Sequence, residues 1–140
     1  DRPVEEMYVD QLKYTNKVIE QVVTGLQAGS GPAPIIVIQS DEGPHPPAHD
    51  GWGEELKVSW GRASDVELGR KLRILNAYYL PGDPAIKPYP TITPVNTFRL
   101  ILNDYFGESL PLLPDRTYVF TDFEHPYRFE DVTDRLRGPV

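Results

Sequence analysis

Two adjacent carboxylates, at Asp41 and Glu42, are the side chains whose types and positions could do chemistry most directly. They come soon after an apolar, β-branched run at residues 35–38 and directly before Gly43 and Pro44. Glycine allows the chain to turn sharply and proline stiffens the exit, so we expect the two acids on a tight turn. Because ligands in open α/β sheets bind just beyond the carboxyl ends of strands, this turn is a candidate ligand site.

Two histidines follow this turn. His45 and His49 lie in a segment rich in Gly and Pro, and Asp50 comes directly after the second histidine. Carboxylates and imidazoles at the end of a strand can bind a divalent cation. Oxygen-rich sets suit Mg²⁺ or Mn²⁺, and histidine adds Zn²⁺. The alternative is that the acids are ordinary loop residues and that both histidines are solvated rather than ligating.

Other side chains offer less specific chemistry. Ser40 precedes the acids, but no G-x-S-x-G nucleophile elbow surrounds it. Trp52 and Trp60 could line a pocket, and Tyr78 and Tyr79 could stack on a sugar, although core or loop packing explains them more simply. A self-contained sugar-binding domain is therefore a third and weaker hypothesis.

The composition bounds the function classes. The chain has 140 residues, a formal net charge of -7, 15 prolines and no cysteine. The length fits one domain, and the acidic balance argues against a nucleic-acid partner, because phosphate binding needs clustered Lys and Arg. Without cysteine there is no disulfide, no thiolate zinc site and no cysteine nucleophile.

No apolar run approaches the ~18 residues of a membrane span, and there is no signal-peptide pattern. The polar start at residues 1–3 is typical of the cut edge of a longer protein.

Hydrophobic periodicity and turn residues predict helices alternating with strands. The predicted helices are residues 4–28, 65–71 and 94–106, the predicted strands are 35–38, 73–80, 117–121 and 127–132, and a long loop covers 43–64. The first strand is continuously apolar, as in a strand buried on both faces. The apolar face of the helix 94–106 is predicted to be Val95, Phe98, Ile101, Leu102 and Tyr105. We therefore expect an α/β fold, in which a small, mostly parallel or mixed sheet is flanked by helices in a single domain over residues 1–140.

The helix and strand that lead to the acidic turn resemble a known family. Residues 8–12, Asn16 and residues 35–44 are similar to the C-terminal half of sulfatase-like domains of the alkaline phosphatase superfamily. This superfamily includes sulfatases and lipoteichoic-acid-synthase-like phosphotransferases. In it, a long helix with a tyrosine near its start leads to a buried strand ending in Ser-Asp-His-Gly or a close relative, whose Asp and His are metal ligands. Segments 76–82 and 91–98 resemble the following strand and helix, so the resemblance covers residues 5–120 in outline.

The resemblance implies roles for the candidate residues. Asp41 would be a metal ligand, Glu42 a ligand or an acid beside the metal, and His45 and His49 contacts to the substrate. The metal would be Mn, Mg, Zn or Ca. The chain would be the C-terminal portion of a sulfatase-like metal-dependent hydrolase or phosphotransferase that acts on sulfate or phosphate esters.

Two departures from the family pattern limit this hypothesis. Position 42 holds Glu where the family has His or Asn, and the family's nucleophile and first metal-binding acid lie in an N-terminal half that this chain lacks. We therefore expect the chain alone to be inactive. The alternative is a non-catalytic interaction or packing module with a degenerate site.

The resemblance to sulfatase-like domains also implies partners and a location for this chain. The expected partner is the missing N-terminal half of the same protein. A homo-oligomer through an exposed sheet edge is a second expectation, and no nucleic acid is expected. The fragment is expected to be soluble. Its compartment stays open, because many relatives carry N-terminal membrane spans and an extracytoplasmic domain.

Overall fold

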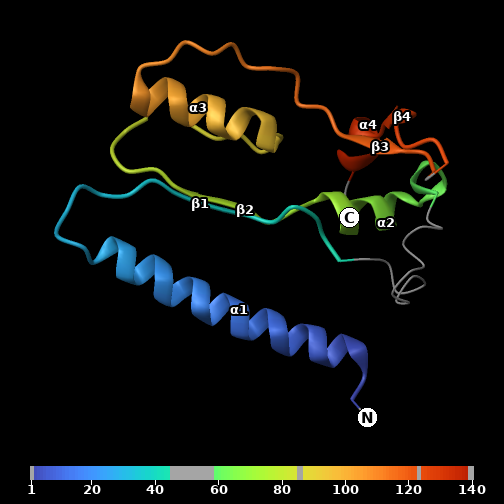
Figure 1. Ribbon diagram of the computed structural model, residues 1–140, viewed down its shortest axis with the longest axis horizontal. Coiled ribbons are helices and arrows are strands. Elements are labelled where there is room, and N and C mark those ends of the chain that lie inside the picture. The colour runs from blue at the N-terminus through green and yellow to red at the C-terminus, as the bar shows by residue number, and fades with distance from the viewer. Residues whose placement is uncertain (1, 45–58, 85–86, 123, 139–140) are drawn as a thin grey trace. The chain divides into compact units, whose positions relative to one another are not determined.

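The computed structural model describes residues 2–44, 59–84, 87–122 and 124–138 (Figure 1). In chain order the elements are helix α1 (Val4–Gln27), strand β1 (Ile36–Gln39), 3-10 helix η3 (Trp60–Arg62), helix α2 (Asp65–Leu72), strand β2 (Asn76–Tyr79), helix α3 (Pro94–Phe106), strands β3 (Tyr118–Phe120) and β4 (Phe129–Asp131), and helix α4 (Thr133–Leu136). The predicted α/β class is confirmed. The short helices η3 and α4 were not predicted.

The described strands form two separate two-stranded sheets, β1 with β2 and β3 with β4. Strand β3 pairs antiparallel with β4, with Val119 opposite Glu130. The first pair is antiparallel too. Ser40 bonds to Leu75 and Gly43 bonds to Lys71, so residue numbers rise along one segment while they fall along its partner. A single mostly parallel or mixed sheet is therefore not formed among these strands. A parallel pair needs a crossover of a dozen or more residues, and the link between β3 and β4 is a short turn.

Contacts between Cα atoms divide the chain into two compact units, residues 1–37 with 78–83, and residues 38–77 with 84–140. The first unit contains α1, which carries Glu5 and Glu6 in its first turn. Negative side chains there interact favourably with the amide groups at the start of a helix. Apolar residues recur along α1 at three- and four-residue steps, and Tyr8, Leu12 and Val22 among them are exposed. Strand β1 is half-buried along its whole length, which is less than the full burial expected.

The second unit contains a small hydrophobic core. Its buried members come from η3, α2, β3 and the residue between β4 and α4, and they are Trp60, Leu68, Val119 and Val132. Leu72, Phe120 and Leu136 pack around them. Helix α2 is held in place at its start by a capping box, in which the Ser64 hydroxyl and the Glu67 carboxylate bond to each other's backbone amides.

Helix α3 buries a different face from the one predicted. Its buried residues are Asn96, Thr97, Leu100 and Ile101, whereas Val95, Phe98 and Leu102 are exposed. The prediction was wrong for these three because it followed apolar residues alone. Asn96 is buried through hydrogen bonds that it both donates to and accepts from the backbone of Leu113. The segment after α3 therefore covers the Asn96 side of the helix.

Candidate functional site

The acidic turn begins directly after β1, as predicted. Ser40 extends the ladder, because its amide donates to the Leu75 carbonyl at 3.1 Å and its hydroxyl accepts from the Leu75 amide at 3.1 Å. The Ser40 side chain is therefore used to end the pairing of β1 with the chain before β2. This arrangement fixes the point at which Asp41 leaves the strand.

Gly43 fixes the other end of the turn. Its amide donates to the carbonyl of Lys71 at 2.7 Å. A Cβ atom at this position would lie 1.9 Å from the carbonyl oxygen of Arg70, which is far inside any permitted contact. A glycine is therefore required because the backbones of the turn and of α2 come so close together.

The carboxylate of Asp41 is exposed on this turn. Its Oδ1 accepts a hydrogen bond from the backbone amide of Glu42 at 2.9 Å. This bond holds the side chain against its own backbone and orients it. A carboxylate of this kind, exposed and hydrogen-bonded at one oxygen, can still act as a ligand for a hard cation.

Glu42 has different surroundings, because its Oε2 lies 2.6 Å from Nζ of Lys71. The Lys71 side chain is 9% exposed and that of Glu42 is 50% exposed. The ammonium also lies 5.8 Å from the centroid of the Trp60 ring, which gives it a cation–π contact. Burying an ammonium is costly unless an anion accompanies it, and Glu42 is that anion.

The structure thus brings Asp41 and Glu42 together but gives them different partners. Among the described residues, no group of three or more His, Cys, Asp or Glu side chains is placed to hold a metal ion. His45 and His49, predicted to contact a substrate, lie outside the described residues. Metal binding by Asp41 and Glu42 therefore stays a prediction, as do the roles of the histidines.

A partly buried polar network near the start of α3 was not predicted. Asp115 accepts hydrogen bonds from the Tyr89 hydroxyl and from both the amide and the hydroxyl of Thr93, the latter two at 2.7 Å. The Asn96 amide nitrogen donates to the Tyr89 hydroxyl at 3.1 Å. The signal available in the sequence is an asparagine in the first turn of the helix, but its partners lie too far along the chain to be identified.

This network changes the acidity of its members. Burial raises the pKa of Asp115, but the hydrogen bonds from Tyr89 and Thr93 outweigh it and lower the pKa below its usual value. The pKa of Tyr89 is raised, first by burial and then by its bond to the Asp115 carboxylate. A carboxylate that stays ionised and a phenol that stays protonated form a fixed hydrogen bond. The network therefore anchors the start of α3.

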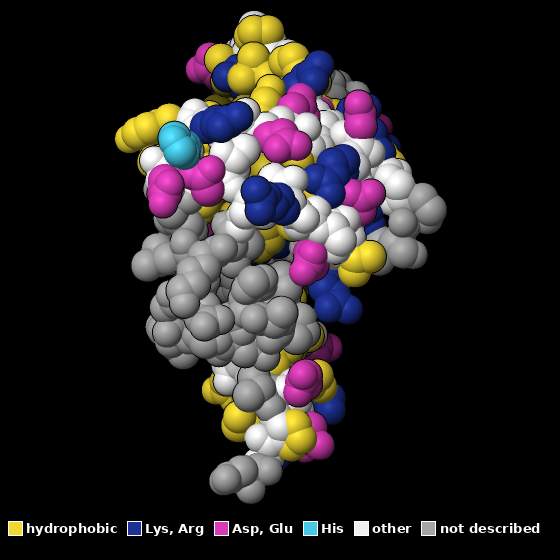
Figure 2. Space-filling model, turned by 90° about the vertical axis from the view of Figure 1, so that its right-hand side faces the viewer, with side chains coloured by type: hydrophobic (Ala, Val, Ile, Leu, Met, Phe, Trp, Pro, Cys, Tyr) yellow, Lys and Arg dark blue, Asp and Glu magenta, His cyan; other side chains and the backbone are white. Residues whose placement is uncertain are grey.

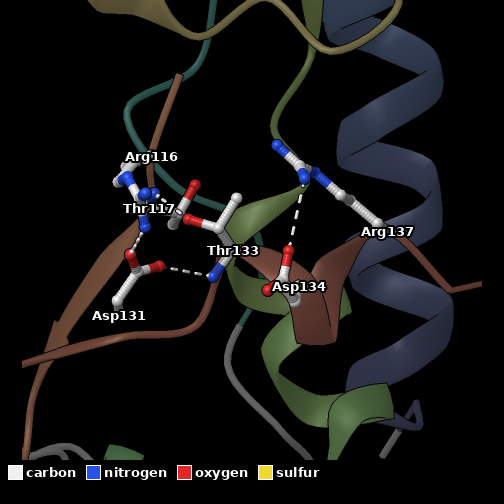
Figure 3. Close-up of polar contacts among 6 residues, drawn as sticks. All are labelled: Arg116, Thr117, Asp131, Thr133, Asp134 and Arg137. Atoms are coloured by element: carbon white, nitrogen blue, oxygen red, sulfur yellow. Dashed lines mark hydrogen bonds and ion pairs between the residues drawn. The ribbon is translucent and has the colours of Figure 1, made fainter. Parts of the chain in front are cut away.

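A second carboxylate cluster lies where β4 meets α4 (Figure 3). Asp131 accepts from the Thr133 amide at 2.9 Å and pairs with Arg116 at 2.5 Å. The Thr133 hydroxyl accepts from the Thr117 amide at 2.9 Å, which ties the start of α4 to the residue before β3. The hydrogen bonds from Thr133 and then from Arg116 lower the pKa of Asp131 to about 2.

Charged side chains of both signs are interspersed on one face of the described residues. On the face drawn in Figure 2, Lys and Arg side chains lie among Asp and Glu side chains over the described residues. Trp60, considered above as a pocket residue, is a core residue. In the part of the chain that the structure describes, no helix combines the length and the apolar character that crossing a membrane requires.

Comparisons with protein-family models, with curated proteins and with solved structures find no match to this chain.

Proposed function

We propose that this chain is the C-terminal portion of a sulfatase-like metal-dependent hydrolase or phosphotransferase that acts on sulfate or phosphate esters. The observation that carries the proposal is the position of Asp41. It is an exposed carboxylate at the carboxyl end of a strand, on a turn fixed at Ser40 and at Gly43. In open, mostly parallel α/β sheets ligands bind just beyond the carboxyl ends of strands, and we propose that the complete protein has such a sheet.

Asp41 fits a divalent cation better than Glu42 does. The Asp41 carboxylate is exposed and hydrogen-bonded at Oδ1, while Glu42 already has the Lys71 ammonium at 2.6 Å. A cation bound there (Mn²⁺, Mg²⁺, Zn²⁺ or Ca²⁺) would polarise an ester oxygen of the substrate. The other ligands, the nucleophile and the remaining strands of a mostly parallel or mixed sheet would come from the N-terminal half. We therefore propose that the chain alone is inactive.

Titration of the complete protein, with its N-terminal half, with Mn²⁺ tests this proposal without any assay of catalysis. Bound Mn²⁺ is measured from the loss of the free-ion electron paramagnetic resonance signal. Replacing Asp41 by Ala should weaken binding by about tenfold or more, because even supporting residues of metal sites contribute roughly 10–100-fold. The exposed Glu108→Gln variant is the matched control, because it removes one charge from a loop far along the chain and should bind as the wild type does. Equal affinities in Asp41→Ala and wild type would sink the proposal.

A second candidate function is a non-catalytic interaction or packing module that keeps this fold with a degenerate site. The ion pair between Glu42 and Lys71 favours it, because an ammonium then satisfies the carboxylate that a metal would need. This hypothesis expects no Mn²⁺ binding that depends on Asp41. It also expects the complete protein, with its N-terminal half, to leave aryl sulfate and aryl phosphate esters intact.

A further inference from the structure

Helix α1 repeats its apolar residues with the spacing of a coiled coil. It is one continuous helix of 24 residues (Figure 1). Along one side of it, six residues follow each other at steps of four and three residues in strict alternation. These residues, which we call the seam, are Tyr8, Leu12, Thr15, Ile19, Val22 and Leu26. A period of about 3.5 residues keeps one line of side chains facing a second helix over the whole length, so the seam indicates a helix as its partner.

Most of the seam is open to solvent. The exposed fractions of its four large exposed members lie between 46% and 55%. Thr15 is exposed as well, and Ile19 is half-buried. Packing two such seams together, with the apolar residues beside them, would bury about 600 Å² on each copy, and specific interfaces bury about 600–1,000 Å² per partner. The seam is therefore just large enough to hold a second chain by itself.

The positions on either side of the seam carry no charge. Between residues 9 and 25 these positions are occupied by Val9, Gln11, Asn16, Val18, Val23 and Gly25. The charged residues after the first turn of α1 lie on the remaining positions of the helix, away from the seam, and they are Glu6, Asp10, Lys13, Lys17 and Glu20. Charges beside a seam decide which partner helix is accepted. Without them, nothing beside this seam repels a second copy of the same helix.

We propose that two copies of this chain pair through α1 in antiparallel orientation, with the seam of each helix packed on the seam of the other. This inference goes beyond the function proposed above and depends neither on Asp41 nor on a metal ion. In a register centred on residue 17, every seam residue faces another seam residue. The facing pairs are Tyr8 with Leu26, Leu12 with Val22, and Thr15 with Ile19. Each contact is then made twice, as a two-fold symmetric interface requires.

The residue one heptad before Leu12 favours the antiparallel orientation. This residue is Glu5, in the first turn of α1. A parallel pair would place each Glu5 opposite the Glu5 of the other copy, and like charges that face each other across an interface are unfavourable. In the antiparallel register Glu5 lies opposite Gly29, which is beyond the end of α1. Only the antiparallel pair therefore keeps like charges apart along the seam.

Disulfide cross-linking tests the orientation, because the chain has no cysteine of its own. Leu12→Cys and Val22→Cys are prepared separately, one of them with an affinity tag, so that mixed and like dimers differ in mass. After mixing and mild oxidation, the mixed disulfide should form at least about tenfold faster than either like disulfide, because the two Cα atoms of a disulfide lie about 4.4–6.8 Å apart. Two copies of residue 12 would lie roughly 15 Å apart along the antiparallel pair.

Lys17→Cys is the matched control, because it places a cysteine on α1 away from the seam and should cross-link slowly in every combination. Circular dichroism shows that each variant is folded, and light scattering gives its mass before oxidation. If a cysteine at residue 12 or 22 dissociates the dimer, Tyr8→Cys mixed with Leu26→Cys makes the same test at the outermost layer of the seam.

Three outcomes would overturn the inference. Like disulfides that form faster than the mixed one would show a parallel pair. A protein of dimer mass that cross-links slowly at all of these positions would have its contact on another surface. A monomer at every concentration would leave the seam to a different chain, such as the proposed N-terminal half.

Discussion

Asp41 and Glu42 are neighbouring carboxylates whose environments differ because of a residue on another element. Lys71 lies on α2, and its ammonium approaches Glu42 and not Asp41. Exposed ion pairs contribute little to stability, but this lysine is almost fully enclosed. Removing Glu42 alone would leave a buried ammonium without the carboxylate that contacts it, which is more harmful than removing both charges together. The pair is therefore better described as a unit than as two independent residues.

Gly43 provides the sharpest prediction at the residue scale. In Gly43→Ala the new Cβ would lie 1.9 Å from the backbone oxygen of Arg70, and backbone cannot move aside as a flexible side chain can. The turn and the end of α2 must separate, and the bond from Gly43 to the Lys71 carbonyl is strained or lost. We expect a loss of about 1–3 kcal/mol in the free energy of unfolding, as for other overpacked sites. Urea denaturation measures it.

Gly25→Ala is the matched control for this substitution. It makes the same chemical change within α1, where no described atom beyond its own neighbours lies within 4 Å of the new Cβ. Alanine is favoured over glycine inside a helix by roughly 0.5–1 kcal/mol. The control should therefore be neutral or slightly stabilising. A Gly43→Ala protein as stable as wild type would show that the turn does not touch α2.

At the scale of elements, the signals that are local in sequence predict structure well. The helix start at Ser64 forms the capping box that its spacing to Glu67 indicates. The end of α3 at Gly107 has the left-handed conformation, φ 72°, that glycine adopts readily. Strands β1, β3 and β4 lie within a residue or two of their predicted ranges. The range 73–80 is shortened to β2, because Arg73 ends α2 and Leu75 bonds to Ser40.

The features that the sequence did not predict depend on contacts between distant residues. The pairing of strands, the ion pair of Glu42 with Lys71 and the bonds of Asn96 to Leu113 each join separate segments. A helix as short as α4 has too few residues to show a period. For the candidate site, the sequence predicted that Asp41 and Glu42 follow a strand, and the structure places them directly after Ser40 at the end of β1. The sequence could not show which carboxylate has a cationic partner.

The junction of β4 and α4 should make the protein sensitive to acid. Asp131 has a folded-state pKa of about 2, below the 3.8 expected without these contacts. A carboxyl whose pKa is lower in the folded state contributes stability that is present above its unfolded pKa. This contribution is lost as the pH falls from about 4 toward 2. The melting temperature should therefore fall over this window, and it should fall less in Asp131→Asn.

Thr133→Val is the matched control for this junction. It keeps the shape of the threonine side chain but removes the hydroxyl, which accepts from the Thr117 amide. The ion pair of Asp131 with Arg116 is retained, so the acid sensitivity should lie between those of wild type and Asp131→Asn. Melting curves recorded from pH 2 to pH 6 at constant ionic strength give the comparison. Parallel pH profiles for wild type and Asp131→Asn would contradict the assigned role of Asp131.

At the scale of the whole molecule, the distribution of apolar side chains matters more for association with another chain than any single element does. The second unit encloses a small core, whereas α1 in the first unit exposes Tyr8, Leu12, Val22 and Leu26 along one stripe. Each two-stranded sheet in the described part of the chain also consists of edge strands alone. Exposed apolar stripes and open strand edges both favour association with another chain. These features are consistent with the proposed N-terminal partner and with self-association.

We therefore expect this chain alone to form a dimer or a higher oligomer. Size-exclusion chromatography with multi-angle light scattering at increasing concentration measures its mass. Val22→Lys places a charge on the exposed stripe of α1 and should shift the protein toward the monomer if this stripe is the contact. Lys17→Gln changes a charge elsewhere on α1, without altering a stripe residue, and is the control. If association survives Val22→Lys unchanged, the sheet edges are the better candidates. A clean monomer at high concentration would contradict the prediction, because it would mean that neither surface drives association.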